Sequence, residues 1–172
     1  MTKPIVVSLF ALFFAACIST TTPNTITYTP EQSEKLGFIA PKGSVLENPP
    51  PNKIRVYGLR EHIIRHIGVS YELYFQHAPN INTLNHLKAK KFEYLGFVGT
   101  FTNGAKFFAD IDADKPVMLM AMMEKPSYLS FEPKAGRIYC VKGGVGSGSF
   151  GARPNLEFLD LNACETLYKK ID

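Results

Sequence analysis

Apolar and polar residues alternate along most of the chain after residue 52. In the segment 53–59, Ile54 and Val56 alternate with charged residues, and the segment 69–76 repeats the pattern. A period of two places one kind of residue on each face of a β-strand, so both segments are predicted strands with one buried face. Stretches of the same kind predict further strands over 92–99, 105–111, 116–123, 128–131, 137–142 and 155–159.

A turn signal separates two of these strands. Asn103-Gly104 lies between aromatic-rich runs, and both residues tolerate the positive φ that a type I′ turn requires. The flanking strands are therefore expected to pair antiparallel as a hairpin. The segment 76–91 breaks the alternation and predicts a long loop or a small insertion that contains a helix.

Short helices are predicted near both ends of the mature chain. Thr29, Pro30 and Gln32 read as a cap, a first helical residue and a capping-box partner, so a helix is expected over 30–36. The segment 162–165 resembles the start of a closing helix, and the apolar residues that follow end in two lysines.

Composition agrees with a β-rich fold, since 13 Gly and 12 Pro favour turns while 8 Tyr and 13 Phe favour strands. The predicted fold class is all-β, an antiparallel β-sandwich of about seven or eight strands with short terminal helices. An α+β arrangement is the alternative, if the segment 76–91 and the tail are more helical than the pattern indicates.

The N-terminus has the features of a signal peptide. Lys3 is followed by a nearly continuous apolar stretch over 5–14, which is too short to span a bilayer. The junction Phe14-Ala15-Ala16-Cys17 is similar to the bacterial lipobox, in which the cysteine is acylated and becomes the mature N-terminus, although Phe14 stands where the lipobox usually has Leu. An ordinary signal peptide cut nearby and an uncleaved anchor are the alternatives.

Three segments are predicted on this basis. Residues 1–16 form a lipoprotein signal peptide, residues 17–52 form a lipidated N-terminus and a Thr/Pro-rich tether, and residues 53–172 form the β-sandwich domain. Two or three acyl chains on Cys17 would anchor the protein stably in membrane lipid. Because position 18 is Ile rather than Asp, resemblance to lipoprotein sorting patterns favours the outer membrane.

A resemblance to known proteins rests on five stretches after residue 52, which are Ile54–Tyr57, Tyr94–Gly99, Thr102–Phe108, Ala135–Tyr139 and Arg153–Phe158. In these stretches the chain resembles an uncharacterised family of bacterial, often lipidated proteins, domain of unknown function 2846. The chain departs from the family at Asp112–Pro116, at Cys140 and in the segment 76–91. The resemblance implies a β-sandwich on a lipid tether and offers no catalytic residue.

Charge argues against a nucleic-acid partner. The formal net charge is +4, and removal of the segment with Lys3 leaves 18 basic against 15 acidic side chains. These basic residues are scattered and form no continuous stripe that could follow a phosphate backbone.

Cys140 and Cys164 remain after Cys17 is assigned to lipidation. An even pair in an oxidising compartment is a candidate disulfide that would close about 25 residues, and two buried free thiols are the alternative.

Other chemical patterns lack the context that their function needs. Residues 146–151 fit G-x-G-x-x-G, yet a strand rather than a helix is expected to follow, so a hairpin loop is favoured over a dinucleotide site. Asp110, Asp112 and Asp114 have the spacing of a calcium loop, but Lys115 stands where that loop requires Gly.

Histidine and methionine patterns also have ordinary explanations. His62 and His66 lack the glutamate of a zinc-protease motif, and His77 and His86 add only a weak metal hypothesis. Alternation would place Met118, Met120 and Met122 on one strand face, a conceivable Cu(I) surface, but core filling is favoured. We therefore expect no catalytic residue, no metal and no cofactor.

The predicted function is that of a non-catalytic cell-envelope lipoprotein whose domain engages an envelope protein. The alternative is a ligand- or metal-binding envelope module. An enzyme is not expected, because spacing alone identifies no catalytic constellation.

Overall fold

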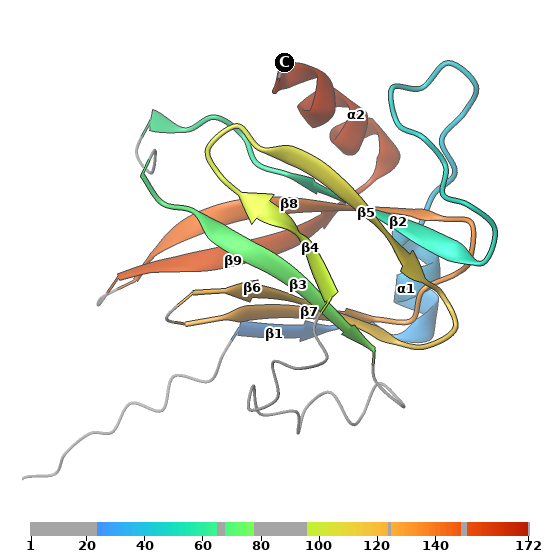
Figure 1. Cartoon of the computed structure of the whole chain (residues 1–172), viewed down its shortest axis with the longest axis horizontal. Helices are drawn as coiled ribbons and strands as arrows, with labels where there is room; N and C mark the ends of the chain where they lie inside the picture. Colours follow the sequence, from blue (N-terminus) through green and yellow to red (C-terminus); the bar gives the residue numbers. More distant parts are fainter. Residues whose placement is uncertain (1–23, 65–67, 78–95, 124, 149–150, 172) are drawn as a thin grey trace, which may run out of the picture.

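The computed structural model describes residues 24–64, 68–77, 96–123, 125–148 and 151–171. In these residues nine strands form two sheets stacked face to face, with one helix on the outer side of the sandwich and another beside it (Figure 1). The prediction of an all-β sandwich is confirmed. None of the described helices is long and apolar enough to span a membrane.

The larger sheet consists, in spatial order, of β1 (Asn24–Thr27), β7 (Ser127–Phe131), β6 (Val117–Met122), β3 (Tyr71–His77) and β4 (Gly96–Phe101). The smaller sheet consists of β5 (Lys106–Asp112), β2 (Lys53–Leu59), β8 (Ile138–Gly148) and β9 (Gly151–Leu159). The pairs β1–β7 and β2–β8 are parallel, and the other neighbouring strands are antiparallel.

The inner faces of the two sheets form the main core. Ile54 and Val56 of β2 are completely buried there, as the alternation predicts. Aromatic rings join the two layers, since the ring centroids of Phe131 and Tyr139 lie 4.7 Å apart. Side chains that alternate with these residues point to the outer faces of the sheets, where the candidate sites lie.

The predicted tether is wrong for residues 24–52, which belong to the folded domain. β1 pairs with β7, and α1 (Pro30–Leu36) follows it with the predicted capping box at Thr29. Further on, Phe38 bridges to Ile138, and Leu46 is only 4% exposed. This segment contains enough apolar residues to cover the smaller sheet, which its Thr and Pro content obscured. The sandwich therefore begins at residue 24 rather than 53.

The predicted hairpin at Asn103-Gly104 is also wrong, because β4 and β5 belong to different sheets. The amide of Ala105 donates to the carbonyl of Thr102 at 3.2 Å, which closes a turn. Gly104 has a φ of +73°, whereas Asn103 does not have the positive φ that a type I′ turn needs. Phe101 and Phe107 both enter the space between the sheets, with ring centroids 4.9 Å apart. The chain thus crosses between layers at this turn.

The last helix, α2 (Leu161–Lys170), begins earlier than predicted. The side chain of Asp160, rather than Asn162, caps it by accepting a hydrogen bond from the amide of Ala163 at 2.8 Å. α2 lies over the outer face of the smaller sheet (Figure 1). The predicted insertion lies outside the described residues from 78 onward.

Candidate functional site

The outer face of the smaller sheet is covered by α2 and by the chain between β1 and β2. The buried side chains in this second apolar cluster are Ala40, Leu46, Tyr57, Leu59, Ile138, Cys140, Leu159, Cys164 and Leu167. This layer is separate from the main core, so the sandwich carries a third packed layer on one side.

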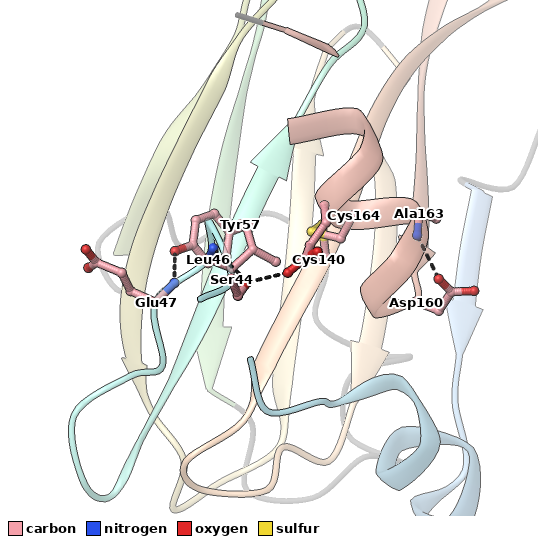
Figure 2. Close-up of a disulfide and its surroundings, with 9 residues drawn as sticks. Ser44, Leu46, Glu47, Tyr57, Cys140, Asp160, Ala163 and Cys164 are labelled. Carbon is pink, nitrogen blue, oxygen red and sulfur yellow. Dashed lines mark hydrogen bonds between the residues drawn. A yellow bond between two sulfur atoms is a disulfide. The ribbon is translucent and has the colours of Figure 1, made fainter. Parts of the chain in front are cut away.

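A disulfide joins α2 to the sheet beneath it. Cys140 of β8 and Cys164 of α2 are bonded, with their Cα atoms 6.1 Å apart, and both are completely buried. Figure 2 shows the bond between strand and helix, with Tyr57 and Leu46 beside it. The phenol oxygen of Tyr57 accepts a hydrogen bond from the amide of Glu47 at 2.9 Å. The candidate cysteine pair thus fixes α2 to the sheet at the centre of this layer.

An open groove of about 440 Å³ runs along one side of α2. Its apolar lining comes from Leu159, Ala163 and Leu167. Its polar lining consists of Glu61, Lys142, Asp160, Asn162, Thr166 and Lys170. The disulfide holds the helix that forms one wall of the groove. An apolar floor with a charged rim is typical of a binding site.

Some of the charged side chains that line the groove are already bound to other groups of the protein, and one is not. Lys170 donates a hydrogen bond to the carboxylate of Glu61, and this bond lowers the pKa of Glu61 below its usual value. The charge of Lys142 adds to the effect, although Lys142 itself makes no ion pair within the described residues. Asp160 is occupied as the helix cap. Lys142 is therefore the cation of this groove that a ligand could engage.

On the other side of α2, cations and aromatic rings stack on the sheet. The guanidinium of Arg55 lies 4.4 Å from the ring centroid of Phe108, and Lys106 lies 4.5 Å from that of Tyr168. Arg55 is bound by Asp110 and Glu47, at 2.7 and 3.1 Å. Because these carboxylates neutralise Arg55, the arrangement stabilises the sheet and leaves that charge unavailable to an anion.

Arg60 is a second buried cation, only 2% exposed, at the end of β2. Its guanidinium donates to the carbonyls of Val69 and Phe101, at 2.6 and 2.9 Å. Its own amide donates to the carbonyl of Ala105 at 2.8 Å. Arg60 thus holds together the β2–β3 and β4–β5 connections at this end of the sandwich, which is a structural role.

The outer face of the larger sheet carries the methionines. Met118 and Met120 form a small cluster with Met122 and the rings of Tyr74 and Tyr128. The predicted alignment on one strand face is therefore present. Met118 and Met120 are buried, as core filling predicts, but they form a small apolar cluster on this outer face rather than part of the main core between the sheets.

In the part of the chain that the structure describes, the remaining sequence motifs do not form sites. Gly146 and Gly148 lie in β8 and Gly151 begins β9, so no helix follows the glycine motif. Asp110 binds Arg55, and Asp112 lies 3.4 Å from Lys53, which leaves no calcium-loop geometry. His66, His86 and Cys17 lie outside the described residues. Within the described part of the chain, no three His, Cys, Asp or Glu side chains are grouped to hold a metal.

The sequence patterns did not identify the groove. Its residues come from four places, namely the end of β2, β8, the end of β9 and α2, which only the packing of α2 brings together. In the sequence, only the pair Lys169 and Lys170 at the end of the predicted helix pointed to this place. That pair is explained equally well by a favourable interaction of the lysines with the helix dipole.

No family model, curated protein or solved structure matches the chain. The resemblance to domain of unknown function 2846 stays a prediction from the sequence.

Proposed function

We propose that the protein is a cell-envelope lipoprotein, anchored in membrane lipid through acylated Cys17, whose β-sandwich is a non-catalytic module that engages an envelope protein. The observation that carries the proposal is the Cys140–Cys164 bond under α2. Disulfides persist in oxidising compartments such as the bacterial periplasm and the cell surface and are rare in the cytosol. This agrees with export by a segment with signal-peptide features over residues 1–16.

The short connection between Cys17 and the domain refines this picture. Only six residues, 18–23, separate Cys17 from the first residue of β1. A fully extended chain spans at most about 3.6 Å per residue, so β1 would begin within about 25 Å of the acylated residue. The domain would therefore stay close to the membrane, with a partner in the same layer of the envelope.

The first experiment tests whether the chain is cleaved before Cys17 and acylated at that residue. The wild-type chain and a Cys17→Ser variant are expressed in a bacterial host with lipoprotein-processing enzymes, membranes are separated, and intact masses are measured. We expect wild-type protein in the outer-membrane fraction, beginning at Cys17 and carrying acyl chains. A chain that still begins at Met1, or an unmodified Cys17, would overturn the anchoring.

The second experiment addresses the partner. Crosslinking in native cells followed by purification should recover a reproducible envelope protein with wild type, and much less of it with Cys17→Ser at equal expression. Recovery of no envelope protein from correctly anchored wild type would contradict the adaptor function while leaving the anchoring intact.

A second candidate function is favoured by the groove beside α2. Leu159 and Leu167 offer an apolar floor, and the available cation Lys142 suits an anionic group. A ligand-binding module of this kind would bind a small amphipathic anion. Thr166→Trp, which fills the groove from the exposed side of α2, should abolish such binding, whereas Lys169→Gln on the same helix should preserve it.

A further inference from the structure

In the part of the chain that the structure describes, each sheet ends in two edge strands. Proteins protect such edges, because the amides and carbonyls on their open side can pair with another chain. β1 is only four residues long, and β9 contains Pro154, which has no amide to donate. The pairing of β4 with β3 is irregular between Leu73 and Tyr74. Three of these four edges are therefore protected by their length, sequence or shape.

β5 is the remaining edge strand, and it has none of these features. All seven of its residues pair with β2 in unbroken register, and it contains neither Gly nor Pro. β4 of the other sheet contacts both β5 and β2, so β4 does not extend past β5 on this side of the sandwich (Figure 1). β5 is thus a regular edge that another strand can reach.

The hydrogen bonds at the two ends of the β2–β5 pair show which backbone groups face this edge. The amide of Arg60 donates to the carbonyl of Ala105 at 2.8 Å, and that of Ala113 donates to the carbonyl of Asn52 at 3.1 Å. Because bonded and non-bonded pairs alternate in an antiparallel ladder, the odd-numbered residues of β5 bond to β2. The backbone groups that point away from β2 belong to Lys106, Phe108, Asp110 and Asp112.

Apolar side chains along this edge are partly exposed. Phe108, on the outer face of the sheet, is 50% exposed. Phe107 and Ala109 pack against the main core, yet both also remain partly exposed. Removal of this apolar surface from water would favour association. The edge therefore offers an occupant apolar contacts as well as backbone hydrogen bonds.

The charges of β5 favour a second copy of the chain as that occupant. Lys106 lies at one end of the strand and Asp112 at the other. An antiparallel copy paired along the whole strand places each Lys106 opposite Asp112 of the other copy, on both sides of a two-fold axis. Opposite charges that face each other across strands are stabilising, and like charges are destabilising. The two Phe108 rings then lie diagonally across the axis, within reach of each other.

We propose that β5 pairs antiparallel with β5 of a second copy, centred on Ala109, so that the two smaller sheets form one continuous sheet. The two-fold axis of such a dimer is perpendicular to the sheet, which leaves the larger sheets of both copies on the same side. Because β1 belongs to the larger sheet, the dimer is compatible with both copies anchored in one membrane. The pairing itself depends neither on acylation of Cys17 nor on the adaptor function.

The first test exchanges the charges at the ends of β5. The whole chain with Cys17→Ser is kept in mild detergent, and sedimentation equilibrium measures the dissociation constant of the dimer. Lys106→Glu and Asp112→Lys each place like charges opposite each other, so each variant alone should dimerise about 10-fold more weakly. An equimolar mixture of the two restores opposite charges and should recover the affinity of the unexchanged chain. Lys169→Glu, the same charge change on exposed α2, should have no effect.

A cysteine at the axis tests the same pairing independently. Residue 109 lies opposite itself in a non-bonded pair, with Cα atoms about 4.5 Å apart, which is within the range of a disulfide. Oxidation should therefore link two copies of Ala109→Cys in the Cys17→Ser background. Asn155→Cys, on exposed β9 at the opposite edge of the same sheet, should stay unlinked.

Several results would overturn the proposal. They are a monomer at every concentration, a dimer that neither charge exchange weakens, and equal linking at residues 109 and 155. A monomer that crosslinks through β5 to a different protein in native cells would assign the edge to a foreign strand, and would also overturn the pairing of two copies.

Discussion

Arg55 and Asp110 are joined by two parallel hydrogen bonds across the β2–β5 pair, from Nε at 2.7 Å and from Nη2 at 2.9 Å. Paired geometry of this kind is stronger than a single contact, because both donors of the guanidinium fork are aligned with the carboxylate. The bond to Asp110 also raises the pKa of Arg55 above its already high usual value. Arg55 therefore stays charged at every pH at which the protein folds. The stability of the domain then depends on Asp110, the carboxylate that pairs with this charge.

Removal of that partner should destabilise the domain. Asp110→Asn leaves the largely buried Arg55 with Glu47 as its remaining carboxylate, so we expect a loss of about 2 kcal/mol in the free energy of unfolding. Urea denaturation measures the loss. Asp114→Asn is the control, because Asp114 is exposed and should change stability by less than about 0.5 kcal/mol. Equal losses in the free energy of unfolding for the two substitutions would show that the Arg55–Asp110 pair does not stabilise the domain.

Loss of the disulfide should loosen α2. With Cys140→Ala and Cys164→Ala together, the closed loop of 24 residues opens in the unfolded state, which costs about 3 kcal/mol. We expect a lower urea midpoint than in wild type, and the same shift in wild type after reduction. Without reductant, neither cysteine should react with iodoacetamide in denaturant. Alkylation of both residues under those conditions would contradict the bond.

Phe107 restricts two glycines on different sheets. A Cβ at Gly58 of β2 or at Gly99 of β4 would lie 2.2 Å from the Phe107 ring. Such overlap displaces a core ring, so Gly58→Ala should cost about 1–3 kcal/mol. Gly68→Ala, where a Cβ meets nothing within 4 Å, is the matched control and should leave the melting temperature nearly unchanged. A neutral Gly58→Ala would mean that Phe107 can move without penalty.

The Glu61–Lys170 pair should make stability depend on acidity. Because the folded pKa of Glu61 is lowered, its contribution is present above the usual glutamate value of about 4.3 and is lost as pH falls through the folded value. The stability difference between wild type and Glu61→Gln should therefore be constant near neutral pH and shrink below about pH 4. High salt should reduce it at neutral pH, because the pair is exposed to solvent. A difference that grows on acidification would reverse the assigned sign.

The central strands could be predicted because successive side chains of a strand point to opposite faces, so alternate apolar residues mark the face that packs in the core. β2 matches its predicted range, and the capping residues of α1 identify its start at the correct position. Local signals of this kind depend only on neighbouring residues. The all-β class follows from them without any knowledge of how the strands are ordered.

Features that depend on distant contacts could not be predicted in the same way. β1 is four residues long and rich in Thr, and only its pairing with β7 distinguishes it from a linker. The turn at Asn103-Gly104 has the residues of a hairpin, yet packing of Phe101 against Phe107 directs the next strand to the other sheet. The groove required the position of α2, which the pairing of Cys140 with Cys164 determines.

The edge position of β1 has a mechanical consequence under the proposed anchoring. Any pull on the lipid enters the domain at Asn24, through a strand that is paired on one side only with β7. Hydrogen bonds between strands lie roughly across the strand direction, so a pull along β1 loads its ladder in shear, with several bonds sharing the force. The domain would thus resist tension from its anchor at β1, its shortest strand. If the β1–β7 ladder broke, β1 would detach before the layer that the disulfide holds on the smaller sheet is disturbed.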